Sequence, residues 1–305
     1  MRVFRSAAAG GFALALAAGP GAGRAYAASP PPEAAGIDPL ELIRRVVKSQ
    51  QRVESAFAGA TYDQREVRIT WGAKGRPENA ESRLFYVLAG ENGAEGSREL
   101  VEVDGRPATE EEKSKAARED EKGRKRRVEQ KAEAQAKAPP RVTGDEDDPL
   151  VGSRRLSELV GRYTIHVVGE EVIEGRPAYV LDFAPSPAAP APKGLSDRAL
   201  NALEGRAVID AATFQIRSVD ARLTRPVRIA GGLAANVKGA EVSYAGQPVG
   251  GGLWFPCAVD FRVTGKTAVF FRLDTSFRAT FTNLRRFNVE TESDVRREPD
   301  AGSNP

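Results

Sequence analysis

Strand-like segments joined by hairpin-length links run through most of this chain, and this feature constrains its fold more than any other. The clearest part, residues 169–223, holds two such hairpins, with turns at Glu174-Gly175 and near Ala211-Ala212. Parallel neighbours in a sheet need crossover connections of a dozen or more residues. Links this short therefore predict an antiparallel sheet in meander order and exclude a βαβ architecture.

Other segments alternate apolar and polar residues in the same way. Residues 82–88 are apolar on both faces, so each face must be covered by protein or by a ligand. The longest alternation lies near the C-terminus, where Thr275 is the only polar residue on a face formed by Val269, Phe271, Leu273, Phe277, Ala279 and Phe281. Altogether the pattern predicts about ten strands.

Two helices are expected beside the strands. Residues 38–58 begin with Asp38 as N-cap and Pro39 at the first helical position. Leu40, Ile43, Val46, Val47 and Val53 recur there at helical spacing and predict a face that packs on the sheet. Residues 109–137 are highly charged, with a capping box at Thr109 and Glu112 and a possible break near Gly123. We expect this insertion to form a solvated helix that projects from the domain.

The N-terminus has the pattern of an export signal. Arg2 and Arg5 precede a short apolar run, and Ala25-Tyr26-Ala27 provides a small-residue cleavage site. The run is shorter than the roughly 20 residues of a membrane span. We expect cleavage after Ala27 and a Pro/Ala linker over 28–37. A single domain should follow over 38–290, with a Pro/Ala loop and a short helix at 184–203. The last segment, 291–305, is expected to be a disordered tail. The mature chain would then be periplasmic.

Charge and cysteine content exclude some functions. The chain has 45 basic and 42 acidic residues, and the expected signal peptide holds three of the arginines and no acid. The remainder is balanced, so nothing favours a nucleic-acid partner. Cys257 is the only cysteine, which rules out an internal disulfide, and it lies too far from the N-terminus to be the lipid-modified residue of a lipoprotein.

No residue set predicts catalysis. The chain lacks the common nucleophile, nucleotide-binding and zinc-hydrolase motifs. Cys257 lies in an apolar context that favours a buried residue over a nucleophile paired with His166. Asp182 and Asp210 could be imagined as an acid/base pair, although solvent-facing strand carboxylates are the more ordinary interpretation. We therefore expect no enzyme, no cofactor and no metal site.

Large apolar residues remain as the candidate functional feature. An open sheet covered by one amphipathic helix leaves part of its concave face unfilled, and exposing a row of Phe and Leu side chains there would be costly. Either the segment 185–203 fills the concavity or an apolar ligand does. A palmitoyl-sized chain gains on the order of 10 kcal/mol from burial. The candidate lining residues are Trp71, Tyr86, Leu88, Phe261, Phe271, Leu273, Phe277 and Phe281.

Three motifs give the chain a family resemblance. They are GEEVIEGRPAYVLDF at 169–183, GRAVID at 205–210 and GGGLWFP at 250–256. Together with the export signal and the N-terminal helix, they resemble outer-membrane lipoprotein-sorting proteins of the LolA/LolB type. The resemblance implies an α+β fold that is mainly β: an incomplete antiparallel β-barrel of about eleven strands. It also implies that helices lie over an apolar cavity, which in this family takes lipoprotein acyl chains. The charged insertion at 109–137 departs from the small carriers of this type.

Two functions therefore stay open. The first is a periplasmic carrier that binds a lipid or a lipoprotein acyl chain. The second is an envelope protein-interaction or stress-sensing module of the same fold without lipid cargo. The basic cluster Arg124–Arg127 could contact an envelope protein or anionic lipid headgroups, at roughly 1 kcal/mol for each basic residue.

Overall fold

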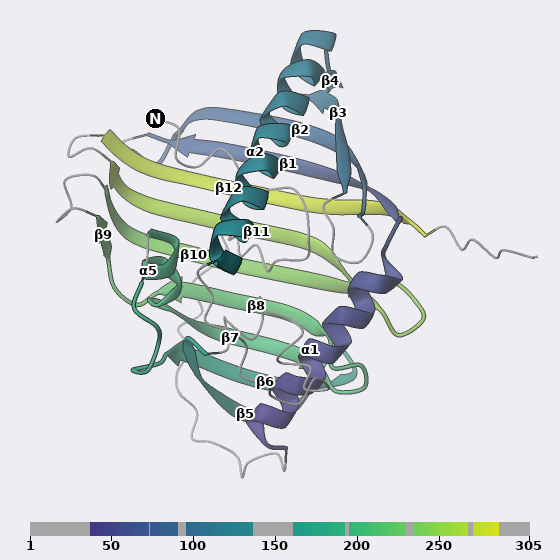
Figure 1. The fold of residues 1–305 in the computed structure, drawn as a ribbon, viewed down its shortest axis with the longest axis vertical. Helices are drawn as coiled ribbons and strands as arrows, with labels where there is room; N and C mark the ends of the chain where they lie inside the picture. The colour runs from purple at the N-terminus through teal and green to yellow at the C-terminus, as the bar shows by residue number, and fades with distance from the viewer. Residues whose placement is uncertain are drawn as a thin grey trace, which may run out of the picture.

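The computed structural model describes residues 37–286 except 73, 91–95, 137–160, 193–194, 230–234 and 268–270. The expected signal peptide, nearly all of the linker and the C-terminal tail lie outside this part of the chain. The described residues form twelve strands and three helices, arranged as two antiparallel sheets that curve as one layer (Figure 1).

The larger sheet has the order β4-β3-β2-β1-β12-β11-β10-β9. Its strands are β1 (Thr61–Trp71), β2 (Pro77–Leu88), β3 (Ser97–Val103), β4 (Arg106–Pro107), β9 (Val227–Ile229), β10 (Ala235–Pro248), β11 (Trp254–Thr267) and β12 (Phe271–Arg285). Consecutive strands pair as hairpins, as the short links predict. The pairing of β1 with β12 joins segments that are some two hundred residues apart in the chain, and no local pattern predicts it.

The smaller sheet has the order β5-β6-β7-β8. Its strands are β5 (Tyr163–Ile173), β6 (Arg176–Pro185), β7 (Leu203–Asp210) and β8 (Ile216–Leu223), and α5 (Leu195–Leu200) lies between β6 and β7. Glu174 and Gly175 have φ angles of 53° and 75°, the left-handed values of a tight hairpin turn. In Figure 1, β8 lies beside β10, so the two sheets continue into each other without closing into a barrel. The predicted half-open antiparallel fold is confirmed, with twelve strands.

Helix α1 (Pro39–Ala56) packs one side on the sheet layer. Asp38 caps it by accepting a hydrogen bond from the Glu41 amide at 3.1 Å. Its buried side contacts β5, β6 and β7 through one apolar cluster and contacts Phe255 through a second. One residue of the predicted face is wrong: Leu42 is fully buried, whereas Leu40 is 55% exposed. Because Leu42 and Leu40 differ by 200° around the helix, only one of them can face the sheet.

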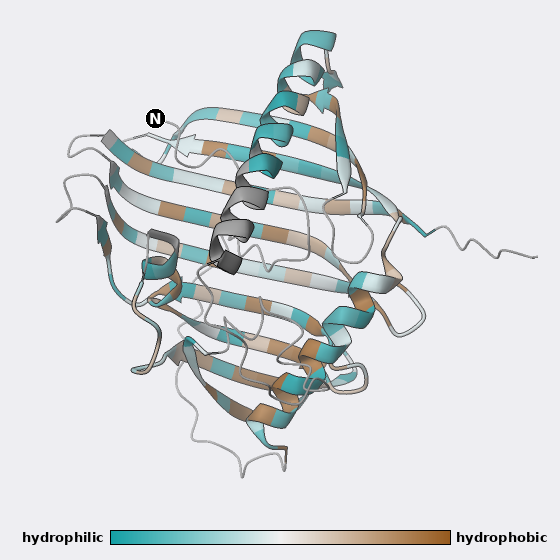
Figure 2. Ribbon diagram, viewed as in Figure 1, coloured by the Kyte–Doolittle hydropathy of each residue, from teal (hydrophilic) through white to brown (hydrophobic). Residues whose placement is uncertain are grey.

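Helix α2 (Glu110–Ala136) runs through Gly123 without a break. The predicted capping box is present: the Glu112 amide donates to Thr109 Oγ1, and the Thr109 amide donates to Glu112 Oε2 at 2.9 Å. Ala116 packs on β2 and β3, and the helix then crosses the sheet on the same side as α1 (Figure 1). Figure 2 shows α2 as almost uniformly hydrophilic where it is coloured, which agrees with a solvated helix.

Strand register assigns each strand residue to one of two faces. We call the face under α1 and α2 the helix-covered face. Tyr62 belongs to it, since its ring contacts Phe255 beside α1 and also joins the cluster around Ala116 of α2. The other face is called the opposite face. These two names are used below.

Candidate functional site

Half-buried apolar side chains gather on the helix-covered face of β10, β11 and β12. Phe261 of β11 lies directly across from Phe277 of β12. Buried Val259 and Ala279 lie between the larger side chains and support them from the sheet. We call the half-buried set the apolar patch; it consists of Tyr244, Phe261, Leu273, Phe277 and Phe281.

The apolar patch lies between the two long helices. The clusters that contain its central residues include no residue of α1 and no described side chain of α2. Phe281 marks the α1 border, since it also packs against the cluster built on Val53 and Phe57. Besides the sheet, the end of α5 contributes to the patch: Phe261 and Leu273 pack against the cluster that contains Ala202, and Phe261 also joins the cluster that Leu200 packs against. The segment that the sequence offered as a filling for the concavity thus covers part of the patch, and among the described residues the rest is held by the sheet. Burial raises the pKa of Tyr244, so its hydroxyl stays neutral.

Charged residues border the patch on its α2 side. Arg98 of β3 pairs with Glu66 of β1 at 2.6 Å and with Asp120 of α2 at 2.7 Å. Arg68 of β1 lies 6.0 Å from the ring centroid of Phe277, which places a cation at the edge of the patch. The helix-covered face is thus apolar on β10–β12 and charged on β1–β3. Such a face suits a ligand with an apolar body and a polar end.

The eight predicted lining residues do not share one face. Phe261, Leu273, Phe277 and Phe281 belong to the apolar patch. Phe271 pairs in register with Thr267 at the end of β11–β12, and its side chain lies outside the described part. The remaining three, Trp71, Tyr86 and Leu88, lie on the opposite face.

Alternation along the strands explains this division. Tyr86 is opposite Asp63 and Leu88 is opposite Thr61, both one residue out of step with Tyr62. The indole of Trp71 donates to Ser276 Oγ at 2.9 Å, and Ser276 precedes Phe277 in the strand, so it points the other way. The structure therefore corrects the grouping of Trp71, Tyr86 and Leu88 with the other lining residues. Sequence reasoning also missed Tyr244. The available signal was its spacing of two residues from the apolar Val242, which places both side chains on the same face of the strand.

The imagined acid/base pair is not assembled. Asp182 and Asp210 both lie on the opposite face, but the register separates them by four residues along the strands, roughly 13 Å. Asp182 pairs with Arg206 at 2.7 Å. Asp210 accepts hydrogen bonds from the amide and hydroxyl of Thr213 at 3.0 and 2.9 Å. Each carboxylate therefore has its own structural partner.

Cys257 and His166 are also far apart. Cys257 is on β11 and His166 is on β5, with β10, β8, β7 and β6 between these two strands. The thiol of Cys257 donates to the carbonyl of Ala245 at 3.3 Å, and burial raises its pKa. A raised pKa leaves little thiolate at neutral pH, which agrees with a structural cysteine.

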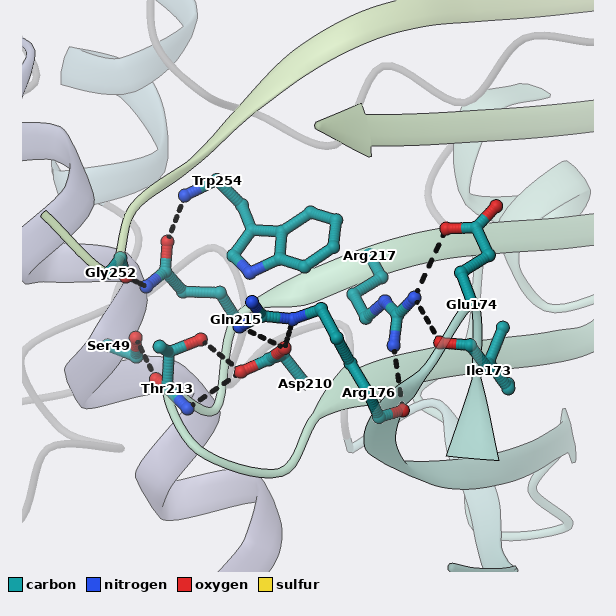
Figure 3. A network of polar contacts seen from close by, with 10 residues as sticks. All are labelled: Ser49, Ile173, Glu174, Arg176, Asp210, Thr213, Gln215, Arg217, Gly252 and Trp254. Atoms are coloured by element: carbon teal, nitrogen blue, oxygen red, sulfur yellow. Dashed lines mark hydrogen bonds and ion pairs between the residues drawn. The ribbon is translucent and has the colours of Figure 1, made fainter. Parts of the chain in front are cut away.

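The three sequence motifs meet at one end of the sheet layer, as Figure 3 shows. Asp210, only 1% exposed, receives the guanidinium of Arg176 at 3.2 Å across the β6–β7 pair. Arg217 donates to the carbonyl of Ile173 at 2.9 Å and lies 4.9 Å from the ring centroid of Trp254. Residues of 169–183, 205–210 and 250–256 thus come into one polar network.

Gln215 joins the β7–β8 turn to the β10–β11 turn. Its amide nitrogen donates to the carbonyl of Gly252 at 2.6 Å, and its amide oxygen accepts from the backbone of Trp254 at 2.7 Å. Ser49 of α1 adds a third element by donating to the carbonyl of Thr213 at 2.7 Å. The network fastens turns and strand ends, so the motifs it contains are structural.

Within the described residues, no group of three or more His, Cys, Asp or Glu side chains is arranged to hold a metal ion. None of the helices in that part of the chain is both long enough and apolar enough to cross a membrane.

Comparison with solved structures finds similar proteins at low sequence identity. A DUF1329 family protein from Desulfovibrio piger is 13% identical and has a TM-score of 0.35, over 83% of this chain and 95% of that one. A domain assigned to outer membrane lipoprotein sorting from Vibrio parahaemolyticus is 11% identical, with a TM-score of 0.29 over 82% and 94%. A LolA superfamily protein from Nitrosomonas europaea is 9% identical, with a TM-score of 0.29 over 81% and 94%.

No family model matches the chain. No curated protein matches it either. The function is therefore inferred from the residues of the chain itself.

Proposed function

We propose that this chain is an exported carrier that binds the acyl chain of a lipid or lipoprotein on its helix-covered face. The observation that carries the proposal is the apolar patch, whose large side chains stay half-buried between α1 and α2. Full burial of an exposed Phe is worth about 1.5–3 kcal/mol. Because Phe261 and Phe277 are already half-buried, an acyl chain that completes their burial would gain roughly half of this for each ring.

The charged border gives the ligand an orientation. Arg68 lies over the ring of Phe277 at the border of the patch, so it is placed to meet an anionic or polar headgroup while the chain lies on the patch. The Arg98–Glu66–Asp120 group next to it is already internally paired and closes that side of the patch. No reaction is needed for such a role.

Ligand uptake tests the proposal directly. The chain, purified gently after export in a bacterial host, should release lipid on solvent extraction and should show bound mass in native mass spectrometry. The delipidated protein should take up a fluorescent long-chain fatty acid. A protein that carries no lipid and takes up no fatty acid would contradict the proposal.

Two variants locate the site. Phe277→Ser should weaken fatty-acid binding about three- to tenfold, because the part of the phenyl group that the ligand would bury contributes about 0.8–1.5 kcal/mol. Tyr86→Ser removes an aromatic ring from the opposite face, where it is 42% exposed, and should leave binding unchanged. If the two variants lose affinity equally, the ligand does not bind at the apolar patch. Thermal melting of each variant checks that it folds.

A second candidate function is an envelope protein-interaction module. It is favoured by Tyr86 and Leu88, which lie on the opposite face of β2 and are 42% and 43% exposed. Their side chains share one face of β2 and would form a small apolar contact surface for a partner. In this case crosslinking in the envelope should capture a protein partner, and Tyr86→Ser rather than Phe277→Ser should abolish that capture.

A further inference from the structure

One row of side chains runs along the side of α1 that points away from the sheet. Its members are Leu40, Arg44, Lys48 and Arg52, each four residues after the last. Residues at this spacing lie on one line of a helix, about 6 Å apart. Leu40 is 55% exposed, and Lys48 and Arg52 are exposed as well. We call this set the α1 row.

The positive charges of the α1 row are not compensated by the described residues. The only acid on that side, Glu41, pairs with Arg45 at 2.7 Å. No ion pair between described residues includes Arg44, Lys48 or Arg52. Glu54 lies two residues after Arg52, so it projects from a different side of the helix.

Helix α2 holds more charged residues than α1, and acids pair with part of its basic side chains. Glu121 pairs with Arg124 and also with Lys125, at 3.3 Å for the lysine. These are the two members of the Arg124–Arg127 cluster whose side chains the structure describes. Lys115, Arg118 and Lys122 of α2 are exposed and in no ion pair between described residues, but the described side chains of α2, residues 110–125, comprise six acidic and six basic residues, whereas α1 has four basic and two acidic residues. The helix with an excess of positive charge among the described side chains is therefore α1.

We propose that the α1 row binds an anionic phospholipid bilayer. Basic side chains gain free energy near an anionic leaflet, and an exposed Leu at one end of the row can enter the headgroup region. The row lies on a convex helix surface, which suits a flat partner.

The position of α1 gives this contact a consequence for the carrier. The buried side of α1 packs on the helix-covered face, so its outward side points in the direction to which that face opens. Binding through the α1 row would turn the apolar patch toward the bilayer. The inference deepens the proposed function, since it names the surface with which the carrier would exchange its ligand.

Vesicle binding tests the inference. The chain without residues 1–27 should sediment with vesicles of phosphatidylglycerol and phosphatidylethanolamine, and much less with phosphatidylcholine vesicles or at raised salt. At about fivefold per basic residue, the variant Arg44→Gln/Lys48→Gln/Arg52→Gln should bind the anionic vesicles about a hundredfold more weakly. Leu40→Asp should also weaken binding.

The matched control removes charge from α2 instead. Arg124→Gln/Lys125→Gln should bind vesicles like the parent chain. The inference is overturned if the parent chain fails to bind anionic vesicles. It is also overturned if the α1 variant binds them as tightly as the parent chain, or if the α2 variant loses vesicle binding. Fatty-acid uptake in solution separates this result from the carrier proposal. The α1 variant should take up ligand normally, and a parent chain that binds vesicles but no fatty acid would contradict only the carrier proposal.

Discussion

At the scale of single residues, burial decides how much a charged side chain contributes to the stability of the fold. Asp182 and Asp210 are the same residue type on neighbouring strands and the same face. Asp182 has a side chain that is 44% exposed and one arginine partner, whereas Asp210 is 1% exposed and holds both Arg176 and the β7–β8 turn. Exposed pairs typically contribute less than about 1 kcal/mol, while buried carboxylates with several donors contribute more.

A pair of alanine variants measures this difference. Asp210→Ala should lower the free energy of unfolding by about 2–4 kcal/mol, because Thr213 loses its side-chain acceptor and the turn loses its link to Arg176. Asp182→Ala should change it by less than about 1 kcal/mol. Urea denaturation provides both values. Equal losses would mean that the network around Asp210 is not what stabilises this end of the sheet.

At the scale of elements, α1 shows what periodicity can and cannot tell. The cap and the start of the helix were predicted, since Asp38 and Pro39 act within one turn. The buried side was predicted except at its first turn, where both Leu40 and Leu42 fit an apolar stripe. The sheet contacts Leu42, and this choice leaves Leu40 at the end of the α1 row.

The two leucines provide a matched test of this assignment. Leu42→Ala should lower the free energy of unfolding by about 2–5 kcal/mol, the range for a fully buried leucine. Leu40→Ala should change it by no more than about 0.5 kcal/mol, since the side chain is exposed. Thermal and urea unfolding monitored by circular dichroism give both. A larger loss for Leu40→Ala would reverse the orientation assigned to α1.

At the scale of the whole molecule, the two sheets are joined at several places. Helix α1 packs on the smaller sheet with its first turns and on Phe255 of the larger sheet with its last ones. Gln215 connects the β7–β8 turn to the β10–β11 turn at the same end. These links predict that both sheets unfold together, in one cooperative transition.

Gln215→Ala tests this coupling. It leaves the buried Trp254 amide without its acceptor and removes the donor to the carbonyl of Gly252, an exposed residue, which together should cost about 1–3 kcal/mol. Hydrogen exchange followed by mass spectrometry should show protection lowered equally in β6–β7 and in β11–β12. Loss confined to one sheet would show that the sheets unfold independently.

The sequence by itself determined the strands, most turns, the helix caps and the antiparallel class. These features depend on interactions within a few residues, such as the alternation of β12, the Glu174-Gly175 turn and the capping box at Thr109. The motifs at 169–183, 205–210 and 250–256 were correctly interpreted as structural, because their turn and strand-end residues act locally.

Only the tertiary structure decided which apolar residues lie together. Strands alternate their side chains, so each apolar row can belong to either face until its neighbours are known. The register of β1 against β2 and β12 placed Tyr86 opposite Asp63, and Phe277 opposite Arg68. The β1–β12 register joins segments from the two ends of the domain, and together with the β1–β2 register it separates Trp71, Tyr86 and Leu88 from the apolar patch. The β10–β11 register, with Tyr244 opposite Val259, places Tyr244 in the patch.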